Sequence, residues 1–198
     1  MTWHNAAQAV TLIGDHRVLL GLSVVFAGIL HWREQDDLAT AWLGALILCL
    51  TMIALSKVIG YTFVRRTPTV PFISVSDHAA FSTFFYLSIS VVARRAVCDR
   101  RHRLIAATMM FVVGTVAATR LILDLHTIWE VLAGVAIGLV AIFAFVRARR
   151  DDTRWLWLYW SALIAAIGFR ITLSYQPVSL EDMVQWIGIH LAGLLFRH

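Results

Sequence analysis

The chain has 198 residues, of which 60% are hydrophobic and only 15% are charged. Soluble domains are on average about half apolar and about a quarter charged, so this composition argues against a soluble globular protein. The net charge is +5, and almost all of the basic residues are arginines. No segment outside the apolar stretches is long enough to offer a basic face to nucleic acid.

Six apolar stretches follow one another along the chain and predict a polytopic membrane protein. Each is long enough, or nearly so, to cross a hydrocarbon core of about 30 Å as a helix. The expected fold class is therefore all-α, with residues 1–198 forming a single integral membrane domain, a helix bundle with about six transmembrane helices. The predicted spans are 18–32, 38–59, 79–97, 104–123, 128–147 and 155–174.

Both ends of the chain carry amphipathic segments. Residues 3–14 either lie in the membrane interface or join the first apolar stretch as part of a span. Residues 180–196 place apolar side chains at helical spacing beside acidic ones, so this tail is either an interfacial helix or a seventh span. Gly134 and Gly138 are four residues apart and permit close helix packing, more readily inside one bundle than between two chains. The oligomeric state is left open.

Arginines are concentrated in two loops, and the positive-inside rule places both loops in the cytoplasm. The connections 60–78 and 120–128 then share the opposite side of the membrane. These two connections carry nearly all the chemically distinctive residues, so we expect them to form one site. The basic loops contain Arg94, Arg95, Arg100, Arg101 and Arg103 in one case, and Arg147, Arg149, Arg150 and Arg154 in the other.

The first distinctive group is Lys57, Arg65 and Arg66, at the end of one predicted span and in the loop after it. Ionisable groups close to membrane depth are costly, so their presence calls for a reason. Three cations would bind a polyanion, with arginine making forked contacts to phosphate oxygens. The alternative is that they anchor a helix end to lipid headgroups.

The second and third groups precede the next two helices on that side. Ser76 and Asp77 are ordinary N-cap residues, and His78 beside them is either a catalyst or an interfacial histidine. His126 and Glu130 are four residues apart and share one face of a helix start. Glu130 would accept a hydrogen bond from one imidazole nitrogen and leave the other to attack, unless the pair merely caps the helix.

The third group resembles a known motif. The run Thr119-Arg120-LILDL-His126-TIW-Glu130 keeps the full spacing of a motif in the type 2 phosphatidic acid phosphatase superfamily. That motif is Ser-Arg, five residues, His, three residues, Asp. The Leu-Ala-Gly that follows is also similar to the family. Glutamate stands here in place of the family's aspartate.

Two further motifs of the superfamily have counterparts over residues 50–145. Val75-Ser76-Asp77-His78 is similar to Pro-Ser-Gly-His, with valine for proline and aspartate for glycine. Lys57 begins a pattern like Lys, six residues, Arg-Pro, although Arg65 comes one residue late and Arg66 is equally eligible. The resemblance implies that this region is the catalytic core of an integral protein of a bacterial inner membrane. Its active site would then lie on the periplasmic or outer face.

The resemblance implies a mechanism and a set of roles. A histidine attacks phosphorus to form a phosphohistidine, a second histidine acts as general acid and base, and fixed cations take the place of a metal ion. No cofactor and no metal are therefore expected. The catalytic residues would be His126, His78 and Glu130, and the phosphate-binding residues would be Lys57, Arg65, Arg66, Ser76 and Arg120. The pattern leaves the role of Asp77 open.

The predicted function is hydrolysis of a lipid phosphate or pyrophosphate. Candidate substrates are polyprenyl pyrophosphate, phosphatidic acid, phosphatidylglycerol phosphate and a lipid A phosphate. The partners expected are this lipid and the surrounding membrane. One alternative is a phosphotransferase that uses a lipid or sugar hydroxyl in place of water, and another is a non-catalytic protein that binds lipid phosphates.

Overall fold

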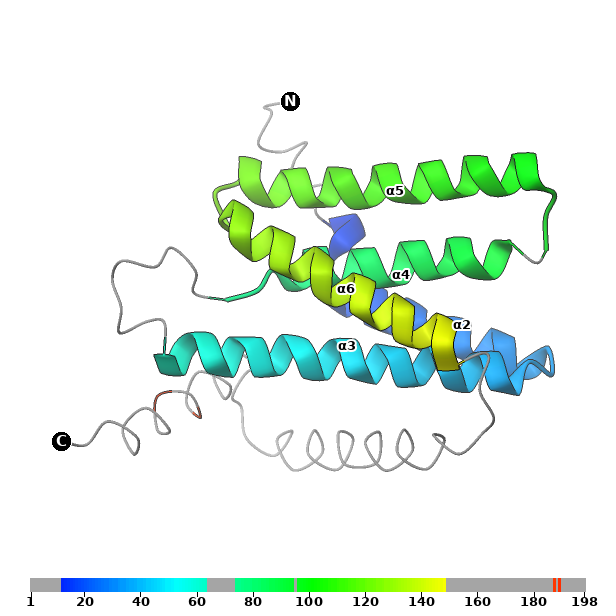
Figure 1. Ribbon diagram of the computed structural model, residues 1–198, viewed down its shortest axis with the longest axis horizontal. Coiled ribbons are helices and arrows are strands. Elements are labelled where there is room, and N and C mark those ends of the chain that lie inside the picture. Colours follow the sequence, from blue (N-terminus) through cyan, green and yellow to red (C-terminus); the bar gives the residue numbers. More distant parts are fainter. Residues whose placement is uncertain (1–11, 64–73, 95, 149–186, 188, 190–198) are drawn as a thin grey trace.

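The computed structural model describes residues 12–63, 74–94, 96–148, 187 and 189 (Figure 1). Within this part the chain is helical and contains no strand, which confirms the all-α prediction there. A short 3₁₀ turn is followed by five α-helices. They are η1 (Leu12–Gly14), α2 (His16–Trp32), α3 (Asp36–Phe63), α4 (Asp77–Ala93), α5 (Asp99–Ile122) and α6 (Ile128–Ala148).

Three of these helices are long and apolar enough to cross a membrane. They contain the candidate spans Asp36–Gly60, Asp99–Ile122 and Ile128–Ala148. Helices α2 and α4 have 17 residues each. At 1.5 Å per residue they are about 25 Å long, which is shorter than a typical hydrocarbon core. The predicted span 155–174 lies outside the described residues.

The predicted terminal helices are also largely outside the described part of the chain. Of the segment 3–14, only Leu12–Gly14 is described, and it forms the turn η1. Of the segment 180–196, only positions 187 and 189 are described.

Helix α4 lies at the centre of the described bundle and contacts α2, α3, α5 and α6 (Figure 1). Its first turn is capped by Ser76, whose Oγ accepts a hydrogen bond from the backbone N–H of Ala79 at 3.4 Å. Such a cap satisfies one of the free amides at a helix start. More than half of the residues in α4 are buried, and most of them are small or aromatic.

Two glycines let α6 approach α4 closely. A Cβ atom at Gly134 would overlap the carbonyl oxygen of Ser76 and lie 3.1 Å from the Cβ of Ala79. A Cβ atom at Gly138 would lie only 2.6 Å from the Cβ of Thr83. Small residues at such positions allow helix backbones to pack against each other in membranes. The predicted use of this glycine pair inside one bundle is confirmed.

The centre of the bundle is an aromatic cluster around Trp42 of α3, which is completely buried. The rings of Phe84 and Phe85 from α4, Phe145 from α6 and Phe26 from α2 lie 4.5–5.8 Å from it. By contrast, many apolar side chains on the outer faces are exposed, as expected of a surface that meets lipid. Examples are Val18, Leu22 and Val25 of α2, Leu104, Met110 and Phe111 of α5, and Leu132, Leu139 and Phe143 of α6.

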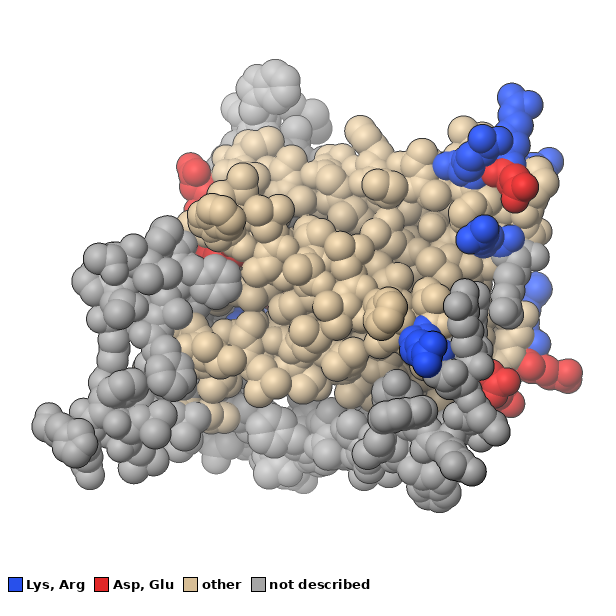
Figure 2. All heavy atoms as spheres, viewed as in Figure 1, with Lys and Arg blue, Asp and Glu red and all other residues tan. Residues whose placement is uncertain are grey.

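The two ends of the described bundle differ in charge. Arginines gather at the end where α4 stops and α5 begins, on the right of Figure 2. The opposite end is where α3 stops, α4 begins, and α5 turns into α6 (Figure 1). The connections that carry the predicted site residues therefore meet at one end of the fold.

Candidate functional site

The turn between α5 and α6 places His126 beside Arg120. Helix α5 stops because Asp124 adopts a left-handed conformation, with φ of 52°. The amides of Asp124 and Leu125 return to the carbonyls of Leu121 and Arg120 at 3.1 Å each, which is the Schellman arrangement. The amide of His126 also donates to the carbonyl of Arg120, at 3.3 Å. The backbone of His126 is thus held next to the last turn of α5.

Glu130 joins this turn to the segment before α4. Its Oε2 accepts from the backbone N–H of Thr127 at 2.9 Å, while Thr127 Oγ1 accepts from the N–H of Glu130 at 3.4 Å. This reciprocal pair is a capping box at the start of α6. Its Oε1 accepts from the N–H of Ser74 at 2.9 Å, and its carbonyl accepts from the N–H of Ser76 at 3.1 Å. A single buried residue therefore holds both loops of the candidate site.

The same carboxylate orients the predicted nucleophile. His126 Nδ1 lies 3.2 Å from Oε2 of Glu130, so Nδ1 carries the proton and Nε2 keeps its lone pair. Burial lowers the pKa of His126 below its ordinary value of 6.5, although the hydrogen bond to Glu130 and its charge act in the opposite direction. The charges of Arg120 and Asp77 also act on this imidazole, the first lowering its pKa and the second raising it.

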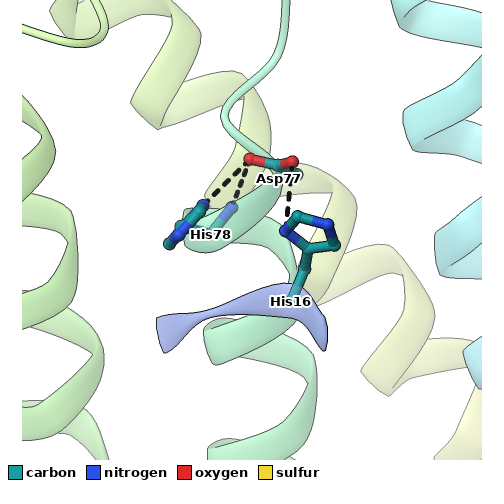
Figure 3. Close-up of side chains that lie close together, drawn as sticks. All are labelled: His16, Asp77 and His78. Carbon is teal, nitrogen blue, oxygen red and sulfur yellow. Dashed lines mark hydrogen bonds and ion pairs between the residues drawn. The ribbon is translucent and has the colours of Figure 1, made fainter. Parts of the chain in front are cut away.

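Asp77 is the centre of a second cluster (Figure 3). Its Oδ1 accepts from the backbone N–H of His78 at 2.9 Å and lies 3.1 Å from Nδ1 of the same residue. Its Oδ2 lies 3.5 Å from Lys57 Nζ and 3.5 Å from His16 Nδ1. Burial by itself raises the pKa of Asp77, but the hydrogen bond from His78 and the charge of Lys57 outweigh it and hold the pKa well below its ordinary value.

His16 reaches this cluster because the chain before α2 is attached to α4 and α5. The hydroxyl of Tyr86 in α4 donates to the carbonyl of Ile13 at 2.8 Å. Gly14 is buried against Val116 of α5, where a Cβ atom would overlap the valine side chain. The first turn of α2 is thereby brought over the start of α4, with His16 facing Asp77 (Figure 3).

The structure brings together most of the residues predicted from the motifs. His126 and Glu130 form one pair, Lys57 joins Asp77 and His78, and the charges of Asp77 and Arg120 reach His126. Arg120 is buried in the last turn of α5. Ser76 is fully buried, and its hydroxyl oxygen is engaged in capping α4. Arg65 and Arg66 lie outside the described residues.

Sequence reasoning did not include His16 in the site. The available signal was the polar triplet Asp15-His16-Arg17, which directly precedes the first predicted span. His16 and Asp77 are far apart in the chain, so no spacing pattern connects them.

Comparisons of this chain with protein families, with curated proteins and with solved structures find no match. A functional assignment therefore depends on the chemistry of the site residues.

Proposed function

We propose that this protein is a membrane lipid phosphatase of the type 2 phosphatidic acid phosphatase kind, with His126 as its nucleophile. The observation that carries the proposal is the hydrogen bond between His126 Nδ1 and Glu130, next to the buried Arg120, whose charge acts on the same imidazole. An imidazole held by a carboxylate through one nitrogen presents the other as a nucleophile. A neighbouring arginine supplies the positive charge that a transferring phosphoryl group needs.

In the first step, the lone pair on Nε2 of His126 attacks phosphorus while the bond from phosphorus to the lipid oxygen breaks. The departing oxygen takes a proton from Nε2 of His78, whose Nδ1 is held by Asp77 at 3.1 Å. The products are a phosphohistidine and a free lipid hydroxyl, or a lipid monophosphate when the substrate is a pyrophosphate. Glu130 stabilises the positive charge that the modified imidazole acquires.

In the second step, a water oxygen attacks the phosphohistidine and the phosphorus–nitrogen bond breaks. The proton lost by water returns to His78, and inorganic phosphate leaves. Arg120, with Lys57 and Arg65 or Arg66, neutralises the phosphate oxygens in both steps. Since these cations are part of the chain, the reaction is proposed to need no metal ion.

The site is proposed to open at the outer surface of a bacterial inner membrane. In this arrangement α2 and α4 cross the bilayer together with their flanking residues, and a sixth span at 155–174 completes the bundle. The lipid enters sideways, so that its tail lies between spans and its phosphate meets the cations. The chemistry fits any lipid phosphate or pyrophosphate.

The test is release of inorganic phosphate by the purified full-length protein in detergent. The substrates are phosphatidic acid, phosphatidylglycerol phosphate, undecaprenyl pyrophosphate and lipid A phosphate, each with and without EDTA. We expect wild-type activity on at least one substrate, unchanged by EDTA, and a loss of roughly 10⁴-fold or more in His126→Ala. The matched control is His102→Ala, a histidine at the opposite end of α5, which should retain wild-type activity.

A labelled substrate separates the hydrolase from related reactions. A phosphatase should form an alkali-stable, acid-labile phosphoprotein in the wild type and not in His126→Ala. If label reaches the protein but phosphate appears only when a lipid or sugar alcohol is added, the protein is a phosphotransferase. If wild type and His126→Ala release phosphate equally, the nucleophile is wrong.

A second candidate function is a lipid-phosphate binder without catalysis. The observation that favours it is the ion pair between Lys57 and Asp77, because a carboxylate already neutralises one of the expected phosphate-binding cations. Such a protein would bind vesicles that contain phosphatidic acid without releasing phosphate. Asp77→Gly, which restores the residue of the resembling motif, should then strengthen vesicle binding.

A further inference from the structure

We propose that His16, Asp77 and His78 form a binding site for a divalent transition-metal ion, with Zn²⁺ as the expected ion. Two imidazole nitrogens and one carboxylate oxygen converge here from the first turns of α2 and α4 (Figure 3). This donor set is one that zinc uses when it has three protein ligands and an open fourth position. Neither the sequence motifs nor the proposed reaction requires such a site.

The separations of the donor atoms suit a tetrahedral ion. Ligands about 2.0–2.1 Å from a tetrahedral centre lie about 3.3 Å from each other. Nδ1 of His78 lies 3.1 Å from Oδ1 of Asp77, and Nδ1 of His16 lies 3.5 Å from Oδ2. One ligand atom from each of the three residues lies within 4.8 Å of the others. Shifts of a few side-chain torsions would therefore bring all three onto one ion.

The surroundings also fit a metal ligand set. Nδ1 of His16 is shielded from solvent and makes no hydrogen bond within the described part of the chain, although it faces the Asp77 carboxylate. An ion would satisfy this nitrogen. When Asp77 binds the ion through Oδ1, Lys57 Nζ stays 3.5 Å from Oδ2 and supports the carboxylate from the outer shell, while His16 moves from Oδ2 onto the ion.

The donor types decide the class of ion. Imidazole nitrogens favour Zn²⁺, Co²⁺, Ni²⁺ and Cu²⁺, whereas Mg²⁺ and Ca²⁺ prefer sites built only from oxygen. The site therefore differs in chemistry from the Mg²⁺ sites of many phosphoryl-transfer enzymes.

The consequence for activity rests on the proposed phosphatase function. An ion on Nδ1 of His78 displaces the proton shared with Asp77, so release of the Nε2 proton to the departing oxygen would leave a metal-bound imidazolate in place of a neutral imidazole. His78 is then a poorer proton donor in the first step and cannot relay a proton between the two steps as the proposed reaction requires. Zn²⁺ is thus an inhibitor that works through the acid–base residue and not through the nucleophile.

The test of binding uses Co²⁺ as a spectroscopic probe and does not depend on activity. The full-length protein carries an affinity tag without histidine, is stripped with EDTA, and is titrated with CoCl₂ in detergent. We expect the intense visible bands of tetrahedral Co²⁺ at one ion per chain, displaced by Zn²⁺. His16→Ala and Asp77→Asn should lose these bands, with Zn²⁺ affinity reduced roughly 100-fold or more.

Two control variants test whether Co²⁺ binding is specific to this site. His31 also pairs with an aspartate, Asp36, but stands on an exposed surface at the end of α2, and His31→Ala should bind Co²⁺ as the wild type does. His126→Ala should bind Co²⁺ normally while losing phosphatase activity, so failure of the proposed function leaves this measurement intact. Only the pale spectrum of hydrated Co²⁺ in the wild type, or unchanged binding by His16→Ala, would overturn the site.

The inhibitory effect is measured separately. Zn²⁺ should inhibit phosphate release by the wild type over the range in which it displaces Co²⁺. In His16→Ala the concentration for half inhibition should rise roughly 100-fold, in step with the loss of affinity. Inhibition that is equally strong in His16→Ala would refute the link between this site and the reaction.

Discussion

Replacing Gly134 by alanine tests how tightly α6 must pack on α4. The added methyl group would overlap the carbonyl oxygen of Ser76 and come within 3.3 Å of the amide nitrogen of Ala80. Backbone atoms cannot move aside as a flexible side chain can. The helices must therefore separate, and the hydrogen bond from the N–H of Ser76 to the carbonyl of Glu130, now 3.1 Å, must lengthen.

The cost follows from two opposing contributions. Overpacking of a well-filled contact costs about 1–3 kcal/mol, and steric overlap with backbone belongs at the upper end of that range. Alanine is a better helix former than glycine by about 1 kcal/mol. The net effect at Gly134 is a destabilisation of about 2 kcal/mol. For a chain of this size that corresponds to a fall in Tm of roughly 4–8 °C.

Gly114 in α5 is the matched control, because a Cβ atom there would have no neighbour within 4 Å. Gly114→Ala should be neutral or stabilising by up to about 1 kcal/mol. Tm is measured in detergent by intrinsic tryptophan fluorescence, and phosphate release is followed in parallel, since the Ser76–Glu130 junction borders the site. Equal effects of the two substitutions on Tm would refute the close contact between α6 and α4.

Further predictions concern the site and its supporting turn. Because burial lowers the pKa of His126, the acid limb of kcat/KM should lie below pH 6.5, and a limb above pH 7 would contradict its role. Glu130→Gln removes a charge that raises this pKa, so it should move the limb to lower pH and cut kcat roughly 100-fold or more. Asp77→Asn should destabilise by about 1–3 kcal/mol at pH 7. Since the folded-state pKa of Asp77 is depressed, the difference in unfolding free energy between wild type and Asp77→Asn should shrink as the pH falls below 3.8. A difference that stays constant with pH in urea unfolding would count against the ion pair with Lys57. Asp124→Ala should cost about 1 kcal/mol while Asp124→Gly should not, as judged by Tm, because φ is 52° there.

Local patterns in the sequence were sufficient for several features of the fold and the site. The apolar stretches 38–59, 104–123 and 128–147 correspond to α3, α5 and α6, because the length of an apolar helix follows directly from its composition. The pairing of His126 with Glu130 was also predictable, since residues four apart at a helix start lie on one face.

The end of α4 was less predictable. Helix α4 ends at Ala93, before the end of the predicted span 79–97, because Arg94 and the turn before Asp99 follow it. Helix ends depend on caps and on the next element, which composition does not specify.

Only the tertiary structure decided the surroundings of Asp77 and Glu130. Sequence identified Asp77 as an unusual residue in its motif but could not show that Lys57 and His16 meet its carboxylate. It also could not show that the N–H of Ser74 donates to Glu130. Contacts between helix ends that are far apart in the chain depend on how the helices pack, here on the small residues that set α6 against α4 and on the turn that carries His16 over α4.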